Sequence, residues 1–309
     1  MSEAPTRCGF VAVLGAPNAG KSTLVNALVG QKVSIVTQKV QTTRIPVRGI
    51  AMRGSTQIVF VDTPGIFAPK RRLDRAMVKA AWGGAADADV VLVLADAPEL
   101  AARASGLAAG DTARIVDGLK AAGKRAALVL NKIDGMKRET LLPLADSLNK
   151  SGIFDRTFMI SATKGDGLGE LTDYCAGLMP EGPFLYPEDQ AADIPSRLLA
   201  AEITREKLYL RLHDELPYAS TVTTESWKEM KDGSIRIDQT IFVERDGQKA
   251  IVIGKGGRAI KAIGEAARAD MEQSFGCRVH LFLHTKVAEH WGDSHAHYRE
   301  WGLEFPKDQ

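Results

Sequence analysis

The segment GAPNAGKS at residues 15–22 constrains the fold of this 309-residue chain more than any other feature. It follows the apolar run FVAVLG and precedes the helical pattern TLVNALVG, which predicts a tight turn between a β-strand and an α-helix. Glycines in such a turn let backbone N–H groups gather around phosphate groups. Lys21 is then placed to reach the β- and γ-phosphates, and Ser22 to offer a hydroxyl group to Mg²⁺. The spacing therefore predicts a nucleotide-binding loop.

The residues around this loop predict an α/β domain. Between residues 9 and 179, short apolar runs alternate with helical stretches, which is typical of a mostly parallel sheet covered by helices. The strands are expected at residues 10–15, 46–52, 56–62, 88–96, 125–132 and 156–162. Residues 180–195 hold four prolines and show no period, which indicates a linker. We therefore expect a first domain over residues 1–180, a linker over 181–195 and a second domain over 196–309.

Three later segments supply the other parts of a nucleotide site. In VFVDTPG, Asp62 ends a strand and is placed to hold Mg²⁺ through water, and the Gly65 N–H is placed to meet a γ-phosphate. In LVLNKID, Asp134 can accept two N–H bonds from the edge of guanine, and adenine offers no such pair, which favours GTP over ATP. In ISAT, the Ala162 N–H is placed near the guanine carbonyl.

The order and spacing of these motifs resemble the G-domain GTPase superfamily over residues 9–179. The resemblance implies a Mg²⁺ ion held by Ser22, Asp62 and a threonine of the first switch, for which Thr42 and Thr43 are candidates. We favour Thr43, which immediately precedes Arg44. The GTP-binding residues that the resemblance implies are Gly15, Ala16, Pro17, Asn18, Ala19, Gly20, Lys21, Ser22, Thr23, Asp62, Thr63, Pro64, Gly65, Ile66, Asn131, Lys132, Asp134, Ser161 and Ala162.

The residue after DTPG bears on the rate of hydrolysis. Many related GTPases have a glutamine there that orients water, and Ile66 cannot do so, which predicts slow intrinsic hydrolysis. Asn18 resembles the asparagine of GTPases that bind K⁺ beside the phosphates in place of an arginine finger. A macromolecular partner that completes the site is the alternative. We take Asn18, Lys21, Thr43 and Gly65 as the catalytic set.

A second glycine turn, IVIGKGG at residues 251–257, reads as an apolar strand end followed by a turn and a helix start. No Ser or Thr follows its lysine, so it is not a second loop of the first kind. The expected order of helix, strand, strand, helix, helix and strand resembles an α+β KH domain of the bacterial topology (type II). In KH domains the GxxG turn lets single-stranded nucleic acid approach closely. The implied RNA contacts are Ile253, Gly254, Lys255, Gly256, Gly257, Arg258 and Lys261, with Ile260 beside them.

A GTPase domain, a proline-bearing linker and a KH domain resemble the Era family of bacterial GTPases, and GPFLYPED and WGDSHAHYREWGLEF look like its linker and tail. The resemblance implies binding to 16S ribosomal RNA near its 3′ end and a role in 30S subunit assembly. It also implies a cytoplasmic monomer with loose inner-membrane association. A tRNA-modifying relative would need a modification domain and a C-terminal reactive cysteine, and neither is visible. An RNA chaperone with a vestigial first domain is disfavoured by the intact Lys21, Ser22, Asp62 and Asp134.

Composition limits the remaining classes. No apolar run approaches 18 residues and no signal-peptide pattern is seen, so we expect no membrane span. Three scattered cysteines predict no disulfide framework. The net charge is +2 and the chain from residue 195 onward is balanced, so an RNA site there must be a local patch. His290, His295 and His297 lack metal-ligand spacing, and we set a metal site aside.

Overall fold

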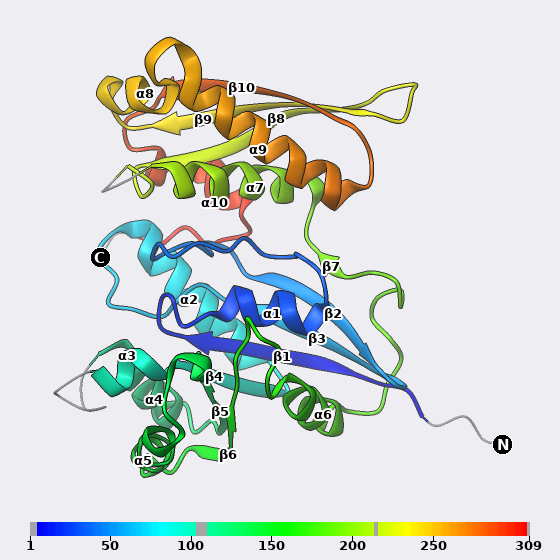
Figure 1. Ribbon diagram of the computed structural model, residues 1–309, viewed down its shortest axis with the longest axis vertical. Helices are drawn as coiled ribbons and strands as arrows, with labels where there is room; N and C mark the ends of the chain where they lie inside the picture. The colour runs from blue at the N-terminus through cyan, green and yellow to red at the C-terminus, as the bar shows by residue number, and fades with distance from the viewer. Residues whose placement is uncertain (1–4, 103–109, 213–215, 308–309) are drawn as a thin grey trace. The chain divides into compact units, whose positions relative to one another are not determined.

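The computed structural model describes residues 5–102, 110–212 and 216–307 (Figure 1). The chain divides into two compact units, each of which is described by itself. The first unit comprises residues 1–34, 43–193 and 306–309, and the second comprises residues 35–42 and 194–305. Within the described residues, no helix has the length and apolar character needed to cross a bilayer. Cys8, Cys175 and Cys277 are free thiols.

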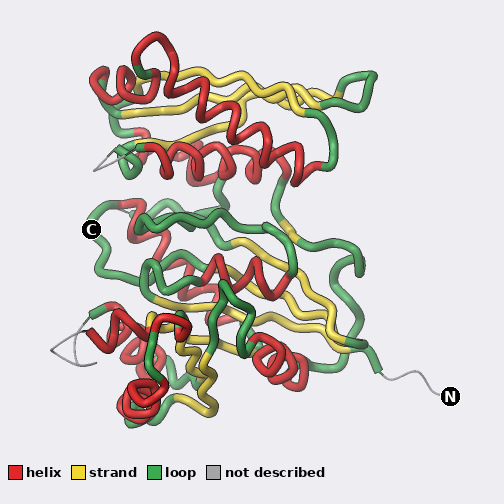
Figure 2. The backbone as a smooth tube through the Cα atoms, in the orientation of Figure 1, coloured by secondary structure: helices red, strands yellow, loops and turns green. Residues whose placement is uncertain are grey.

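The first unit is built on a seven-stranded sheet in the order β6-β5-β4-β1-β3-β2-β7 (Figure 1). Figure 2 shows the strands in yellow and the helices in red. β2 runs antiparallel to β3 and β7, and the other neighbouring pairs are parallel. The central strands consist almost wholly of buried residues, as expected for a sheet covered on both faces. The strands are β1 (Arg7–Gly15), β2 (Val47–Arg53), β3 (Thr56–Asp62), β4 (Val90–Asp96), β5 (Ala126–Asn131), β6 (Phe154–Met159) and β7 (Ala192–Asp193).

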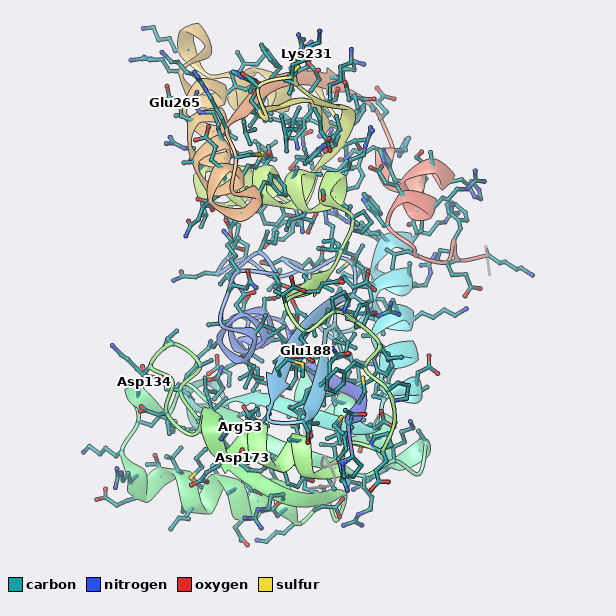
Figure 3. All side chains as sticks on the ribbon, turned by 90° about the vertical axis from the view of Figure 1, so that its right-hand side faces the viewer. Arg53, Asp134, Asp173, Glu188, Lys231 and Glu265 are labelled. Carbon is teal, nitrogen blue, oxygen red and sulfur yellow. The ribbon has the colours of Figure 1, made fainter. Side chains whose placement is uncertain are left out.

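Helices cover both faces of this sheet. α1 (Lys21–Val29) and α6 (Leu168–Leu178) share one apolar core, and α2 (Arg72–Asp87) and α4 (Asp111–Ala121) share another. α3 (Ala97–Ala102) and α5 (Arg138–Asn149) pack in a third cluster beside β5. Arg53 at the end of β2 and Asp173 of α6 point toward each other and form an ion pair of 2.6 Å (Figure 3). The predicted parallel α/β domain is confirmed, and its loops at the carboxyl ends of the strands are where ligands bind in such folds.

The chain that follows α6 stays attached to the first unit. Gln57 of β3 is fully buried, and its Oε1 accepts the N–H groups of Leu185 and Tyr186 at 2.9 and 3.0 Å. Its Nε2 donates to the carbonyl oxygen of Tyr186 at 2.8 Å. β7 then pairs with β2, and Asp193 accepts hydrogen bonds from Arg48 and from the Tyr186 hydroxyl. A side-chain amide thus holds an extended segment in place where no strand pattern was visible.

The second unit is a three-stranded sheet in the order β10-β9-β8, formed by β8 (Ser220–Glu229), β9 (Ile235–Val243) and β10 (Val279–Val287). β9 pairs in parallel with β10 and antiparallel with β8. α7 (Ser196–Arg211) and α9 (Arg258–Phe275) pack their apolar residues on one face of it. α10 (His295–Glu300) lies on the other face, where His297 contacts Phe242. His295 stacks on Phe305 and His297 on Trp301, so these rings serve packing.

One expectation about this unit is wrong. The IVI run at residues 251–253 is the last turn of α8 (Asp246–Ile253) and not the end of a strand. The helix starts because Gln248 Oε1 accepts the N–H groups of Glu244 and Arg245, which would otherwise lack partners at a helix start. A three-residue apolar run cannot by itself separate a strand from a buried helical turn. The helix, strand, strand, helix, helix, strand order of the unit is confirmed.

Candidate functional site

The first glycine loop joins β1 to α1. Asn18 and Gly20 have positive φ angles of 62° and 97°, which lets the loop curl back above the helix start. A Cβ atom at Gly15 would lie 2.6 Å from the Leu94 carbonyl oxygen, and one at Gly20 would lie 2.4 Å from Asn131 Nδ2. Both glycines are therefore required by close packing. The N-terminus of α1, which carries a partial positive charge, opens onto this loop and suits an anion.

Lys21 is the buried cation of the loop. Its Nζ donates to the carbonyl oxygens of Gly15 and Ala16 at 3.1 and 2.9 Å. Burial lowers the pKa of the Lys21 ammonium to about 8, against a smaller opposing effect of the Asp62 carboxylate. A buried ammonium of this kind is poorly compensated by carbonyl oxygens alone, so it favours a phosphate group as a partner.

Three oxygen-bearing side chains meet beside the start of α1. The Thr43 hydroxyl lies 2.8 Å from the Ser22 hydroxyl and 3.4 Å from Asp62 Oδ2. Asp62 is fully buried, and its Oδ1 has no hydrogen-bond partner among the residues that the structure describes. Burial raises the pKa of Asp62, although Lys21 and the neighbouring hydroxyls oppose the rise. A hard cation with oxygen ligands such as Mg²⁺ fits this set, because it would satisfy the carboxylate in its buried position.

Asp62 is followed by a turn that closes on the glycine loop. The Thr63 hydroxyl donates to the Val13 carbonyl oxygen at 2.7 Å, and the Ile66 N–H donates to that of Gly15 at 3.1 Å. A Cβ atom at Gly65 would lie 3.0 Å from the Pro17 nitrogen. The Ile66 side chain is fully buried in the apolar core with α2, so this position cannot present a polar group to water.

The predicted base-recognition residues gather at the ends of β5 and β6. Asn131 Nδ2 donates to the Ala19 carbonyl oxygen at 2.9 Å, and Asn131 Oδ1 accepts the Ala162 N–H at 3.1 Å. The Ser161 hydroxyl donates to Asp134 Oδ1 at 2.6 Å, and this bond lowers the pKa of Asp134. The side chain of Asp134 is thus held as an anion with one oxygen still available. An exposed, oriented carboxylate beside the glycine loop can accept from the N–H edge of guanine.

Lys132 connects this region to the glycine loop through a residue that the motifs did not include. It adopts a positive φ of 66°, and its Nζ donates to the Asn18 carbonyl oxygen at 2.8 Å. It also forms an ion pair with Asp96, the last residue of β4, whose Oδ1 accepts the Glu99 N–H at 3.0 Å. Asp96 lies at the carboxyl end of a buried strand, and this position is the sequence feature that could have identified it as a residue of the site.

The second glycine turn, at residues 254–257, lies between α8 and α9. Gly254, Gly256 and Gly257 have φ angles of 71°, 62° and 75°, a region that side-chain-bearing residues rarely adopt. A Cβ atom at Gly254 would lie 2.7 Å from the Ala259 Cβ. The side chains of Lys255, Arg258 and Lys261 are exposed around the turn, and Ile260 packs partly on the core. The start of α9 and three cations therefore face solvent together, which suits a phosphate backbone.

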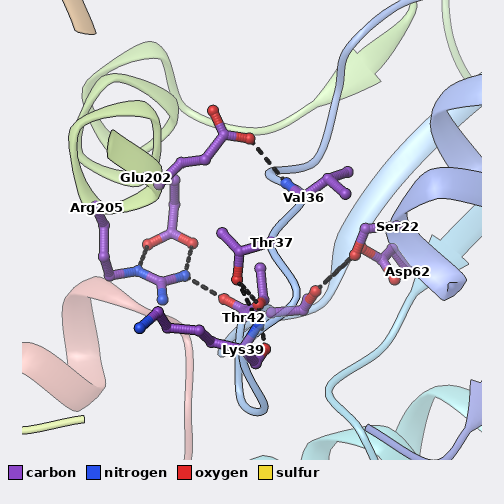
Figure 4. Close-up of polar contacts among 10 residues, drawn as sticks. Ser22, Val36, Thr37, Lys39, Thr42, Asp62, Glu202 and Arg205 are labelled. Atoms are coloured by element: carbon purple, nitrogen blue, oxygen red, sulfur yellow. Dashed lines mark hydrogen bonds and ion pairs between the residues drawn. The ribbon is translucent and has the colours of Figure 1, made fainter. Parts of the chain in front are cut away.

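Residues 35–42, which precede Thr43, pack within the second unit against α7 (Figure 4). The Val36 N–H donates to Glu206 Oε1 at 2.9 Å, and Lys39 Nζ donates to the Leu212 carbonyl oxygen at 2.5 Å. Arg205 donates to the Thr42 carbonyl oxygen. The Thr42 hydroxyl bonds with Thr37 and with the Lys39 carbonyl oxygen, each at 2.6 Å, so it serves the turn itself.

The fold and the site together define a class, a P-loop GTPase domain followed by a KH domain. Residues 10–132 match the family model of the 50S ribosome-binding GTPases, and residues 215–292 match the KH domain model. The chain is 57% identical to GTPase Era of Maricaulis maris, covering 99% of both chains, and 60% identical to GTPase Era of Rhizobium meliloti, covering 98% of this chain and 95% of the relative. The chain belongs to the Era family of GTPases.

Two solved structures of that family are also similar. One is Era in complex with MgGDPNP and nucleotides 1506–1542 of 16S ribosomal RNA, with a TM-score of 0.89, 37% identity and coverage of 96% of this chain and 99% of that one. The other is a variant of Aquifex aeolicus Era with one tyrosine replaced by alanine, bound to GDP.AlF4⁻, with a TM-score of 0.88, 38% identity and the same coverage. The predicted family, fold class and GTPase activity are confirmed by these comparisons.

Proposed function

We propose that this chain hydrolyses GTP with Mg²⁺ and binds 16S ribosomal RNA near its 3′ end through its KH domain, as a factor in 30S subunit assembly. The observation that carries the proposal is that one chain has two different glycine-containing turns that suit phosphate groups. The first is a glycine loop joined to an oriented carboxylate, Asp134, that can read guanine. The second is a GxxG turn flanked by exposed cations in a KH fold, which can accept a nucleic-acid strand.

The nucleotide side of the proposal assigns roles to residues of the first unit. The ammonium group of Lys21 exchanges the Gly15 and Ala16 carbonyl oxygens for phosphate oxygens. The hydroxyls of Ser22 and Thr43 and the carboxylate of Asp62 would hold Mg²⁺, which neutralises charge on the phosphate oxygens when it is bound. The Gly65 N–H is available to the γ-phosphate. Asp134 recognises the N–H edge of guanine, and the Ala162 N–H exchanges Asn131 Oδ1 for the guanine carbonyl oxygen.

The rate of hydrolysis is expected to be low without help. Ile66 is buried and offers no acceptor for an attacking water, and the glycine loop supplies no arginine. Asn18, which is exposed at the loop tip, is the residue we propose for a K⁺ ion that would supply the missing charge. Turnover of GTP should therefore be faster in KCl than in NaCl at equal ionic strength. Equal rates in the two salts, with the Asn18→Ala variant unchanged in both, would remove K⁺ from the proposal.

The RNA side rests on the GxxG turn and on the solved relative bound to nucleotides 1506–1542 of 16S ribosomal RNA. Membership of a 30S assembly pathway, the monomeric state, a cytoplasmic location and loose inner-membrane association are parts of the proposal that rest on the family resemblance.

The test is a pair of measurements on the full chain. GTP and ATP should be compared as competitors for Mg²⁺-dependent binding, and RNA of the 3′ end of 16S ribosomal RNA should be compared with a shuffled RNA of equal length. We expect selective binding of GTP and of the authentic RNA. Crosslinking in cells that recovers mainly tRNA or mRNA would overturn the ribosomal assignment while leaving the GTPase assignment intact.

A further inference from the structure

α7 holds residues 35–42 by two adjacent charged residues that are almost fully buried. Arg205 is 1% exposed and Glu206 is 3% exposed. Arg205 forms a two-pronged ion pair with Glu202 on the same helix, and its guanidinium lies 5.0 Å from the ring centroid of Tyr209. One of its N–H groups also donates to the Thr42 carbonyl oxygen. Figure 4 shows the fork of Arg205 between Glu202 and the backbone of Thr42.

Burial of Arg205 is costly, and packing alone does not explain it. Burial acts to lower the pKa of Arg205, and the Glu202 carboxylate outweighs it, so the pKa lies above its usual value and the guanidinium stays charged. Its Nη1 atom is buried with no hydrogen-bond partner among the described residues. Apolar residues of similar volume often stabilise a protein core as well as a buried ion pair does. The placement of this arginine therefore indicates a positional role, and the Thr42 carbonyl is what it positions.

The Thr42 carbonyl and the Thr43 nitrogen belong to the same peptide group, which is planar. Fixing the carbonyl oxygen therefore fixes the direction in which the chain enters Thr43. The Thr43 hydroxyl lies 2.8 Å from the Ser22 hydroxyl and 3.4 Å from Asp62 Oδ2, the atoms assigned to Mg²⁺. Thr42 clusters with the second unit and Thr43 with the first, so the peptide bond between them is one of the points at which the chain passes from one unit to the other.

We propose that Arg205 is a positioning residue for GTP hydrolysis, which holds the Thr42 carbonyl so that the Thr43 hydroxyl stands at the metal site. The inference rests on the proposed metal role of Thr43. The proposal gives α7, the first helix of the second unit, a part in positioning the switch threonine.

The test compares Arg205→Lys with Arg197→Lys in the full chain. A lysine keeps the charge beside Glu202 but cannot reproduce the planar fork that also reaches Thr42. Arg197 is the matched control, because it lies on α7 and donates to the Thr224 and Glu225 carbonyl oxygens at 2.8 and 2.9 Å. We expect Arg205→Lys to slow single-turnover hydrolysis by roughly tenfold and to weaken a GTP analogue more than GDP, since switch threonines engage the metal in the triphosphate state. Arg197→Lys should change neither.

A double-variant cycle with Thr43→Ala separates positioning from a general loss of structure. If Arg205 acts through Thr43, the Thr43→Ala and Arg205→Lys double variant hydrolyses GTP as slowly as Thr43→Ala alone. Two results would overturn the positioning role and leave the proposed function standing. One is a double variant whose loss of hydrolysis rate is the product of the two single losses. The other is an Arg205→Lys variant that loses GDP and GTP-analogue affinity equally and has a lowered melting temperature. A Thr43→Ala variant with unchanged hydrolysis would instead overturn the metal role of Thr43, and the inference with it.

Discussion

The ion pair between Lys132 and Asp96 gives the sharpest test of how the base-recognition residues are held to the glycine loop. Replacing Asp96 by Asn keeps an acceptor for the Glu99 N–H, which Asp96 Oδ1 accepts at 3.0 Å, and Asn caps helices well. The single remaining oxygen cannot also serve Lys132, which faces an amide N–H₂ group in the variant. The change therefore isolates the support of Lys132, while the bond from Lys132 to the Asn18 carbonyl oxygen remains.

The expected loss of nucleotide affinity follows from the solvent exposure of the Lys132–Asp96 pair. A hydrogen bond to a charged group contributes about 1.5–3 kcal/mol. The side chain of Lys132 is 42% exposed and that of Asp96 is 12% exposed, so solvent screening reduces the loss to about 1–2 kcal/mol. That range corresponds to a loss of about 5- to 30-fold in affinity. GDP and a GTP analogue should weaken equally, with kcat unchanged, because the metal site is not touched.

The assay is calorimetric titration of both nucleotides with Mg²⁺, with melting temperature as a check on folding. Arg125→Met is the control, because Arg125 pairs with Asp155 at the opposite end of β5 and both side chains are largely exposed, at 61% and 46%. It should leave both affinities within about twofold. Unchanged GDP affinity in Asp96→Asn, or a loss limited to the GTP analogue, would refute the reasoning.

Changes at three other positions have expected outcomes. Because the pKa of Lys21 is about 8 and phosphate favours its charged form, GDP binding should take up a proton above pH 8 and weaken as pH rises, as calorimetry in two buffers would show. Between pH 8 and the ordinary lysine pKa of 10.5, the unfolded chain binds more protons than the folded chain. Burial of Lys21 therefore makes the free energy of unfolding rise with pH in this range. The Lys21→Met variant should lack that rise. Gly254→Asp should weaken RNA binding at least tenfold with GTP affinity intact, because the new Cβ would lie 2.7 Å from the Ala259 Cβ and the new charge repels phosphate. The control Gly247→Ala should leave RNA binding unchanged, because a Cβ there has nothing within 4 Å. Equal RNA affinities of the two variants in a filter-binding assay would contradict this prediction. Asp134→Asn should lower GTP affinity by about 10- to 100-fold and reduce discrimination against ATP in competition, and preserved selectivity would remove Asp134 from base recognition.

The first unit was largely predictable from sequence because its signals are local. Each strand except β7 overlaps a segment that the sequence pattern predicted, and every nucleotide motif lies at the carboxyl end of such a segment. β7 has two residues, and its pairing depends on contacts of Asp193 with Arg48 and Tyr186, which no local pattern contains. The error at the IVI run, residues 251–253, has the opposite cause. A local apolar pattern was present, but three residues are too few to distinguish a strand from a helical turn.

The site was predictable where a motif requires a residue type and not where a partner is distant. Lys132 belongs to a motif, but Asp96, its partner, lies 36 residues away in a strand end that has no motif of its own. Arg205 is further removed, since 163 residues separate it from Thr42. No local pattern marks Arg205 and Glu206 as buried, and their burial is seen only when residues 35–42 pack against α7.

The contacts of Gln57 and β7 leave only a short connection between the first sheet and α7. Residues 185–193 are tied to the first sheet, and α7 begins at Ser196, so Ile194 and Pro195 alone form the joint on that path. The ring of Pro195 restricts its own φ angle and the conformation of the residue before it. A two-residue connection of this kind has few free backbone torsions. Glycines inserted there would add backbone freedom to the connection and leave the Gln57 and β7 contacts in place.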